Sequence, residues 1–126
     1  MYVKIFLGLM AAMFAAFGVV ALANPIGLTA GLGVEVGGPN GAYELRGIYG
    51  GVSLGAALLC AGGAFRASLR LPALWFVIVY MGGYVFARAA ALLLGPPPTS
   101  DYAGFVAFEV AALAGAVVSL RASAAR

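Results

Sequence analysis

The sequence contains no histidine, a single cysteine and very few charged residues. Histidine is the commonest metal ligand, the usual haem ligand and the usual proton shuttle, so its absence argues against all three kinds of site. Cys60 stands alone in an apolar segment, which excludes a disulfide or a Cys-x-x-Cys redox pair within these residues. We therefore expect no metal, no cofactor and no catalytic residues, and we predict that the protein is not an enzyme.

Charged residues make up only 9% of the 126 residues, whereas hydrophobic residues make up 64%. A soluble globular domain averages about 45–50% apolar and about 25% charged residues. The seven Lys and Arg are scattered and form no basic run, so no nucleic acid is expected as a partner despite the net charge of +3. This composition is typical of an integral membrane protein, whose first partner is the lipid bilayer.

Four long apolar segments occupy nearly all of the sequence, at approximately residues 4–24, 44–65, 72–94 and 102–120. A spanning helix needs roughly 20 apolar residues, so each segment is long enough to cross a bilayer. We predict an all-α bundle of four transmembrane helices, forming a single integral membrane domain over residues 1–126.

The end of the first segment allows two interpretations. Ala21-Leu22-Ala23 resembles the cleavage site of a secretory signal peptide, but the apolar run exceeds the ~7–15 residues usual for such peptides. We therefore expect a retained helix that Asn24-Pro25 ends, since proline cannot continue it. Residues 25–42 would then form a glycine-rich outer loop, in which Val34-Glu35-Val36 and the turn signal Pro39-Asn40-Gly41 favour a small hairpin.

The charges outside the apolar segments are distributed unevenly. One side of a four-span arrangement holds five basic residues, Lys4, Arg66, Arg70, Arg121 and Arg126. The other side holds the acidic Glu35 and Asp101. Because cytoplasmic ends of spans carry excess Lys and Arg, the pattern predicts a bacterial inner-membrane protein with both termini in the cytoplasm. Cleavage of the first segment would leave three spans whose loops lie on the same sides of the membrane as in the four-span arrangement. The distribution of charge therefore does not distinguish the two arrangements.

Four charged residues fall inside or at the edge of the apolar segments: Glu44, Arg46, Arg88 and Glu109. Such residues cost about 2.5–3.5 kcal/mol at the centre of a spanning helix, so they face the protein interior and find partners. Arg88 and Glu109 lie at matched depths, about 9–10 Å from the outer ends of antiparallel helices, and we predict that they meet. With Glu44 and Arg46 near the same level, the four charges would form a neutral cluster. Such a cluster would lock the bundle, line a pocket for a small ligand or a proton, or contact a partner subunit.

Two patterns of helical spacing accompany these charges. Tyr80, Tyr84 and Arg88 recur every fourth residue and predict a polar-edged stripe. Tyr49 adds a further tyrosine to this candidate pocket. Small residues recur in the same way, and we predict two helix-packing faces: Gly47, Gly51 and Gly55 in the second segment, and Ala107, Ala111, Gly115 and Ser119 in the fourth. Glu109 would then point away from the second of these faces.

The run Glu44-Leu45-Arg46-Gly47-Ile48-Tyr49-Gly50-Gly51 resembles the signature of a bacterial family described as domain of unknown function 4345. Asn24-Pro25, an arginine in the third span and a glutamate in the fourth are also similar. The resemblance covers nearly the whole chain and implies four spans, but it implies no biochemistry. The small multidrug exporters are another four-span family of this size. They carry a working glutamate in the first span, where this chain has no acid.

Three classes of function follow from these patterns. A non-enzymatic accessory or scaffolding subunit ranks first, with another membrane protein or a second copy of the chain as partner, because little of the chain lies outside the bilayer. The alternative is a small transporter or proton-coupled permease that uses Arg88 and Glu109. An enzyme acting on lipid or quinone ranks last, since Ser53 has no visible base beside it and no carboxylates show catalytic spacing.

Overall fold

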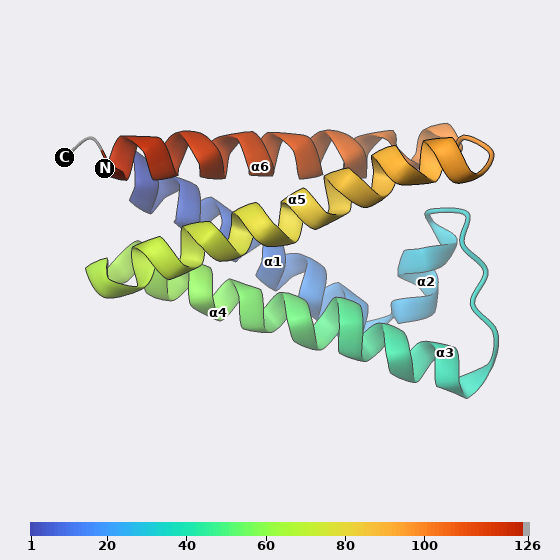
Figure 1. The fold of residues 1–126 in the computed structure, drawn as a ribbon. Coiled ribbons are helices and arrows are strands. Elements are labelled where there is room, and N and C mark those ends of the chain that lie inside the picture. The colour runs from blue at the N-terminus through green and yellow to red at the C-terminus, as the bar shows by residue number, and fades with distance from the viewer. Residues whose placement is uncertain (125–126) are drawn as a thin grey trace.

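The computed structural model describes residues 1–124, and these are helical along almost their whole length (Figure 1). The elements, in chain order, are α1 (Tyr2–Ala23), α2 (Pro25–Ala30), α3 (Gly38–Leu45), the π-helix η1 (Arg46–Gly51), α4 (Val52–Phe65), the 3-10 helix η2 (Ala67–Leu69), α5 (Arg70–Leu94), the 3-10 helix η3 (Ser100–Tyr102) and α6 (Ala103–Ala124). Four continuous helical stretches in this part of the chain are long and apolar enough to cross a membrane: Tyr2–Ala23, Gly38–Phe65, Ala67–Leu94 and Ser100–Ser123. The all-α bundle with four spans, predicted from the sequence, is confirmed.

The first span ends where the sequence places its end. Helix α1 stops at Ala23, and Pro25 occupies the first turn of α2, where its missing N–H costs nothing. The side chain of Asn24 caps α2, because its Oδ1 accepts a hydrogen bond of 2.9 Å from the N–H of Gly27. The chain therefore turns sharply at this point and leaves the line of α1.

The connection between the first two spans is not the hairpin expected from the sequence. Helix α2 occupies its first part, α3 begins at Gly38, and no strand occurs within residues 1–124. Pro39 stands in the first turn of α3. Proline is favoured in the first turn of a helix just as it is in a β-turn, so the same residue fits either structure. The hairpin prediction is therefore wrong, and the second span starts six residues earlier than expected, at Gly38 rather than at Glu44.

The bundle consists of two antiparallel helix pairs. Helix α1 packs along α4, and α5 packs along α6. Figure 1 shows the pairs close together near the termini and farther apart at the opposite end, where α2 and α3 lie. The two pairs therefore form a wedge that is narrow at one end of the bundle.

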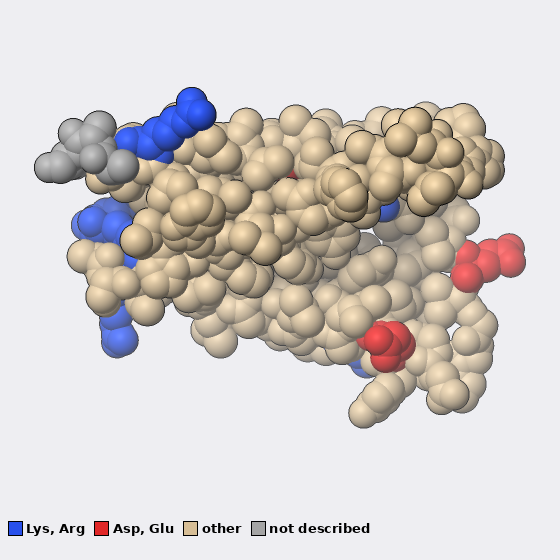
Figure 2. All heavy atoms as spheres, in the orientation of Figure 1, with Lys and Arg blue, Asp and Glu red and all other residues tan. Residues whose placement is uncertain are grey.

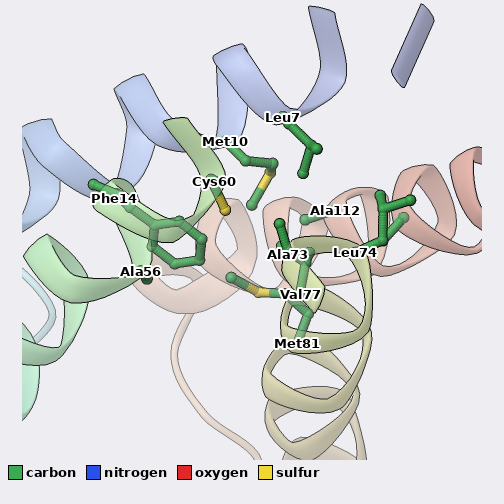
Figure 3. Packing of buried hydrophobic residues seen from close by; sticks show 12 residues of the cluster. Leu7, Met10, Phe14, Ala56, Cys60, Ala73, Leu74, Val77, Met81 and Ala112 are labelled. Carbon is green, nitrogen blue, oxygen red and sulfur yellow. The ribbon is translucent and has the colours of Figure 1, made fainter. Parts of the chain in front are cut away.

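Small and medium-sized side chains fill the narrow part of the wedge (Figure 3). The core contains Leu7, Met10, Phe14, Ala56, Cys60, Ala73, Leu74, Val77, Met81, Ala112 and Ala116. Helix α4 approaches closely because Gly63 has no side chain: a Cβ there would lie 2.8 Å from the Cβ of Ala73 and 2.9 Å from Cδ1 of Leu7. Close contact between apolar helices of this kind depends on small residues at the crossing point.

The glycine face predicted for the second span is not the surface that packs within this chain. Gly47, Gly51 and Gly55 are exposed, and no atom lies within 4 Å of the position of a Cβ on Gly47 or Gly55. The crossing with α1 instead uses Gly50, on another side of the same helix, where a Cβ would lie 2.6 Å from Cδ2 of Leu22. Contact of a partner with the exposed glycine face stays a prediction.

Helix α6 uses only part of its predicted face, since Gly115 and Ser119 pack within the bundle but Ala107 and Ala111 do not. Ala107 and Ala111 are exposed, and the buried residues of this helix are Glu109, Ala112, Ala116 and Ser119. Gly115 is half-buried and contacts the ring of Phe6, which a Cβ would approach to 2.6 Å. Glu109 lies on the side of α6 opposite Ala107, as expected, but this is the side that faces the bundle, and Glu109 pairs there with Arg88 of α5.

Candidate functional site

A cavity of about 430 Å³ lies in the wide part of the wedge, between the two helix pairs. Figure 2 shows the surface hollowed at this end, between α5 and the segment that contains α2 and α3. All four spans contribute to its wall, and the lining includes Phe14 and Phe17 of α1, Tyr49 of η1, Arg88 of α5 and Glu109 of α6. Residues from distant parts of the sequence therefore converge on one hollow.

Arg88 and Glu109 form an ion pair in the wall of this cavity. The Nη2 atom of Arg88 lies 3.0 Å from Oε1 of Glu109, and Nε donates a second hydrogen bond of 3.3 Å to Oε2. The side chain of Glu109 is only 6% exposed, whereas that of Arg88 is 37% exposed. The structure thus brings the two residues together, as their matched depths suggest, and the guanidinium is the more accessible partner.

Aromatic rings surround the guanidinium of Arg88. Its Cζ lies 5.7 Å from the ring centroid of Tyr84 and 5.1 Å from that of Tyr102, both within the range of cation–π attraction. The hydroxyl groups of Tyr80 and Tyr84 are 3.4 Å apart, and both residues line the cavity. The predicted tyrosine stripe therefore forms one side of the cavity.

The π-helix η1 supplies the opposite side. Tyr49 lies in this helix, lines the cavity, and packs against Phe17 with a centroid distance of 5.7 Å. Within the same short run, Arg46 donates a hydrogen bond of 3.0 Å from Nε to the carbonyl oxygen of Leu22, near the end of α1. A π-helix is rare and is frequently found at functional sites. The run Glu44–Gly51 thus joins α1 to the second span and places a tyrosine in the cavity.

The family model with the description Domain of unknown function (DUF4345) matches residues 2–120. The chain belongs to this family. No curated protein and no solved structure matches it. The family resemblance is therefore confirmed over nearly the whole chain. Of the residues that carried it, Tyr49, Arg88 and Glu109 line the cavity of this DUF4345 protein.

Two residues of the predicted charge cluster do not belong to it. Glu44 and Arg46 are exposed, neither lines the cavity, and the Arg88–Glu109 pair is the one ion pair among residues 1–124. Arg46 binds a main-chain carbonyl at the end of α1, where such groups lack an intrahelical partner. The cluster of four charges is therefore wrong, and a single neutral pair takes its place.

The sequence reasoning missed three residues of α6 and its approach. Tyr102, Phe105 and Phe108 line the cavity, together with Asp101 at the preceding turn. Tyr102, Phe105 and Glu109 follow one another at intervals of three and four residues, which places them on one helix face. That spacing is the signal that could have found them.

The wall of the DUF4345 cavity is chemically two-sided. Most of it is aromatic and apolar, while the polar groups are the Arg88–Glu109 pair, the tyrosine hydroxyls, Ser53 and Asp101. Within residues 1–124, no group of three or more His, Cys, Asp or Glu side chains is placed to hold a metal ion. The arrangement suits a ligand with an apolar body and an oxygen that accepts hydrogen bonds from the guanidinium or a phenol.

Proposed function

We propose that this DUF4345 protein binds a small uncharged ligand in the cavity at Arg88, without catalysing a reaction on it. The observation that carries the proposal is the position of the ion pair: it lines an open cavity of about 430 Å³ and does not lie within the packed core. An ion pair whose sole role is to hold helices together has no need of an adjoining cavity. Ligand pockets, by contrast, are mostly apolar hollows with a few convergent polar groups.

The charge and shape of the wall limit the chemistry of the ligand. Arg88 and Glu109 neutralise each other, so the site offers no net charge to a strongly ionic ligand. Aromatic side chains from all four spans, among them Phe14, Phe105 and Tyr84, favour a flat or hydrocarbon body. We therefore propose an amphipathic molecule whose single polar end reaches Arg88.

Transport through Arg88 and Glu109 is the extension of this proposal. The core at the narrow end of the wedge, which includes Leu7, Cys60 and Val77, is fully buried and lies between the cavity and the other membrane surface. A carrier would have to open that end in a second conformation. Flux into proteoliposomes, compared between the parent protein and Glu109→Gln, tests the extension; unchanged flux in the variant would remove it.

Filling the cavity is expected to displace its ligand. Gly104 lines the cavity, and no atom lies within 4 Å of a Cβ placed there, so Gly104→Phe adds bulk to the cavity without a clash at the Cβ. Organic extracts of the purified parent protein should contain a small molecule that is depleted by about tenfold or more in this variant, as a loss of about 1.4 kcal/mol in affinity would produce. Mass spectrometry of the extracts measures the difference.

The matched control is Gly83→Phe. Gly83 is exposed, has no atom within 4 Å of its Cβ position and does not line the cavity. This variant should retain the extracted molecule at the level of the parent. Equal extracts from all three proteins would contradict ligand binding in the cavity.

An accessory or scaffolding role in a larger membrane complex is the second candidate function. Its support is the face formed by Gly47, Gly51 and Gly55, which is exposed and carries no other helix of the chain. The partner would be another membrane protein or a second copy of the chain, packed closely against this face. Co-purification in mild detergent tests the role, and a monodisperse monomer without a partner would argue against it.

The membrane orientation is part of the same proposal. In Figure 2 most of the basic side chains gather at the end where the termini lie, whereas the acidic side chains of the surface lie at the opposite end, where some basic atoms are also visible. This distribution supports a bacterial inner membrane with both termini in the cytoplasm, the side on which basic residues concentrate. A cysteine introduced at Ser123 should then be protected from an impermeant thiol reagent added outside intact cells, and labelling there would reverse the orientation.

A further inference from the structure

A second cavity, of about 460 Å³, lies at the other end of the bundle. It is formed by the start of α1, the turn before α5 and the end of α6. Apolar side chains make up most of its wall, including Val3, Leu71 and Leu120, and the basic residues Lys4 and Arg70 also line it. The cavity therefore combines a hydrocarbon surface with two positive charges at one end of the four spans.

This end of the molecule has no acidic side chain to balance its cations. The four acidic residues of the sequence are Glu35, Glu44, Asp101 and Glu109. The first three belong to the opposite end, and the fourth is paired with Arg88. Within the described part of the chain, the other basic side chains form no ion pair. Within residues 1–124, no side-chain carboxylate at this end is available as a counter-ion.

Among the basic residues at this end, Arg70 shows the lack of an acidic partner most directly. Its side chain is half-buried, and its Nε is shielded from solvent with no hydrogen-bond partner among residues 1–124. A charged group that is partly removed from water without an acceptor is unfavourable, and an anion in the adjoining cavity would relieve this. Ala67, at the start of the continuous helix Ala67–Leu94, also lines the cavity, so the positive end of that helix dipole lies at the same place.

We propose that this cavity binds an anionic phospholipid, with its phosphate at Arg70 and Lys4 and an acyl chain along the apolar wall. Basic pockets between spanning helices are suited to acidic lipid headgroups, and the apolar wall distinguishes a lipid from a soluble phosphate. The site lies at the opposite end of the bundle from the cavity at Arg88. The proposal therefore does not depend on the function proposed for that cavity.

Lipid binding by the purified full chain tests the proposal. Native mass spectrometry would follow titration with phosphatidylglycerol, with zwitterionic phosphatidylcholine and with inorganic phosphate in parallel. We expect the parent protein to prefer phosphatidylglycerol over both. The double variant Lys4→Gln/Arg70→Gln should bind it roughly 25-fold more weakly, at about fivefold for each basic residue near a lipid surface.

Two single variants keep the test independent of folding. The side chain of Lys4 is exposed, so Lys4→Gln leaves the core intact and should still weaken binding by about fivefold. Arg121→Gln removes an exposed charge from the same end, outside the cavity, and should leave binding unchanged. Equal losses in Lys4→Gln and Arg121→Gln would show diffuse attraction and overturn the site. Equal affinity for inorganic phosphate and phosphatidylglycerol would contradict the proposal that the ligand is a lipid. Equal affinity for the two phospholipids would contradict the proposal that the lipid is anionic.

Discussion

Replacement of Glu109 by alanine is expected to lower the free energy of unfolding by about 2–3 kcal/mol. The variant leaves the guanidinium of Arg88 without the carboxylate that accepts two of its hydrogen bonds. Breaking a fully buried ion pair costs about 3–5 kcal/mol, because the remaining charge is uncompensated. The expected loss is smaller here because Arg88 is 37% exposed and can draw on solvent in the cavity. Unfolding of the purified protein in mixed micelles measures the change.

A double variant distinguishes the destabilisation caused by breaking the ion pair from the stabilisation that the intact pair provides. Arg88→Met/Glu109→Leu removes both charges together and should be less destabilised than Glu109→Ala alone, since apolar replacement of a buried pair is often neutral. If the double variant lost as much as Arg88→Met and Glu109→Leu combined, the residues would be acting independently. That outcome would contradict the pairing seen in the structure.

Gly63→Val is expected to cost about 3 kcal/mol, the upper end of the range for overpacking a close-packed core. A Cβ at this position would lie 2.8 Å from the Cβ of Ala73, 2.9 Å from Cδ1 of Leu7 and 3.1 Å from the carbonyl oxygen of Leu69. The two nearest residues are fully buried, and the third contact is with rigid backbone. The helices would have to separate to admit the larger side chain, and the same unfolding measurement would report it.

Gly55→Val is the matched control in the same helix. No atom lies within 4 Å of a Cβ at Gly55, which is exposed, so the change should alter the unfolding free energy of the isolated chain by less than about 0.5 kcal/mol. A large loss at Gly55 in the monomer would mean that the crossing uses the face first expected from the sequence. A loss seen only in a complex would favour the accessory role.

The features that the sequence predicted well depend on local chemistry. Hydropathy marks the four spans, because each backbone segment in lipid must satisfy its own hydrogen bonds as a helix. Asn24-Pro25 marks the end of α1, because proline cannot continue a helix and asparagine caps the next one. The meeting of Arg88 with Glu109 follows from their equal depth in adjacent antiparallel helices.

The features that the sequence did not predict depend on how the helices are rotated and crossed. Small residues occur on several sides of the second span, and the sequence does not indicate that Gly50 and Gly63, rather than Gly47 and Gly55, meet other helices. Arg46 binds the main-chain oxygen of Leu22, an acceptor that no side-chain pattern reveals. The cavity itself results from the divergence of the two helix pairs, which no single segment encodes.

The wedge has a geometrical consequence for the cavity at Arg88. The two helix pairs approach each other closely where Gly63 of α4 faces Ala73 of α5: a Cβ on Gly63 would lie 2.8 Å from the Cβ of Ala73. Tilting one pair relative to the other about this contact would move the distant ends farthest, as the arms of a lever move. The width of the cavity therefore depends on the angle between the two helix pairs, and substitutions that change the packing at this contact are expected to change it.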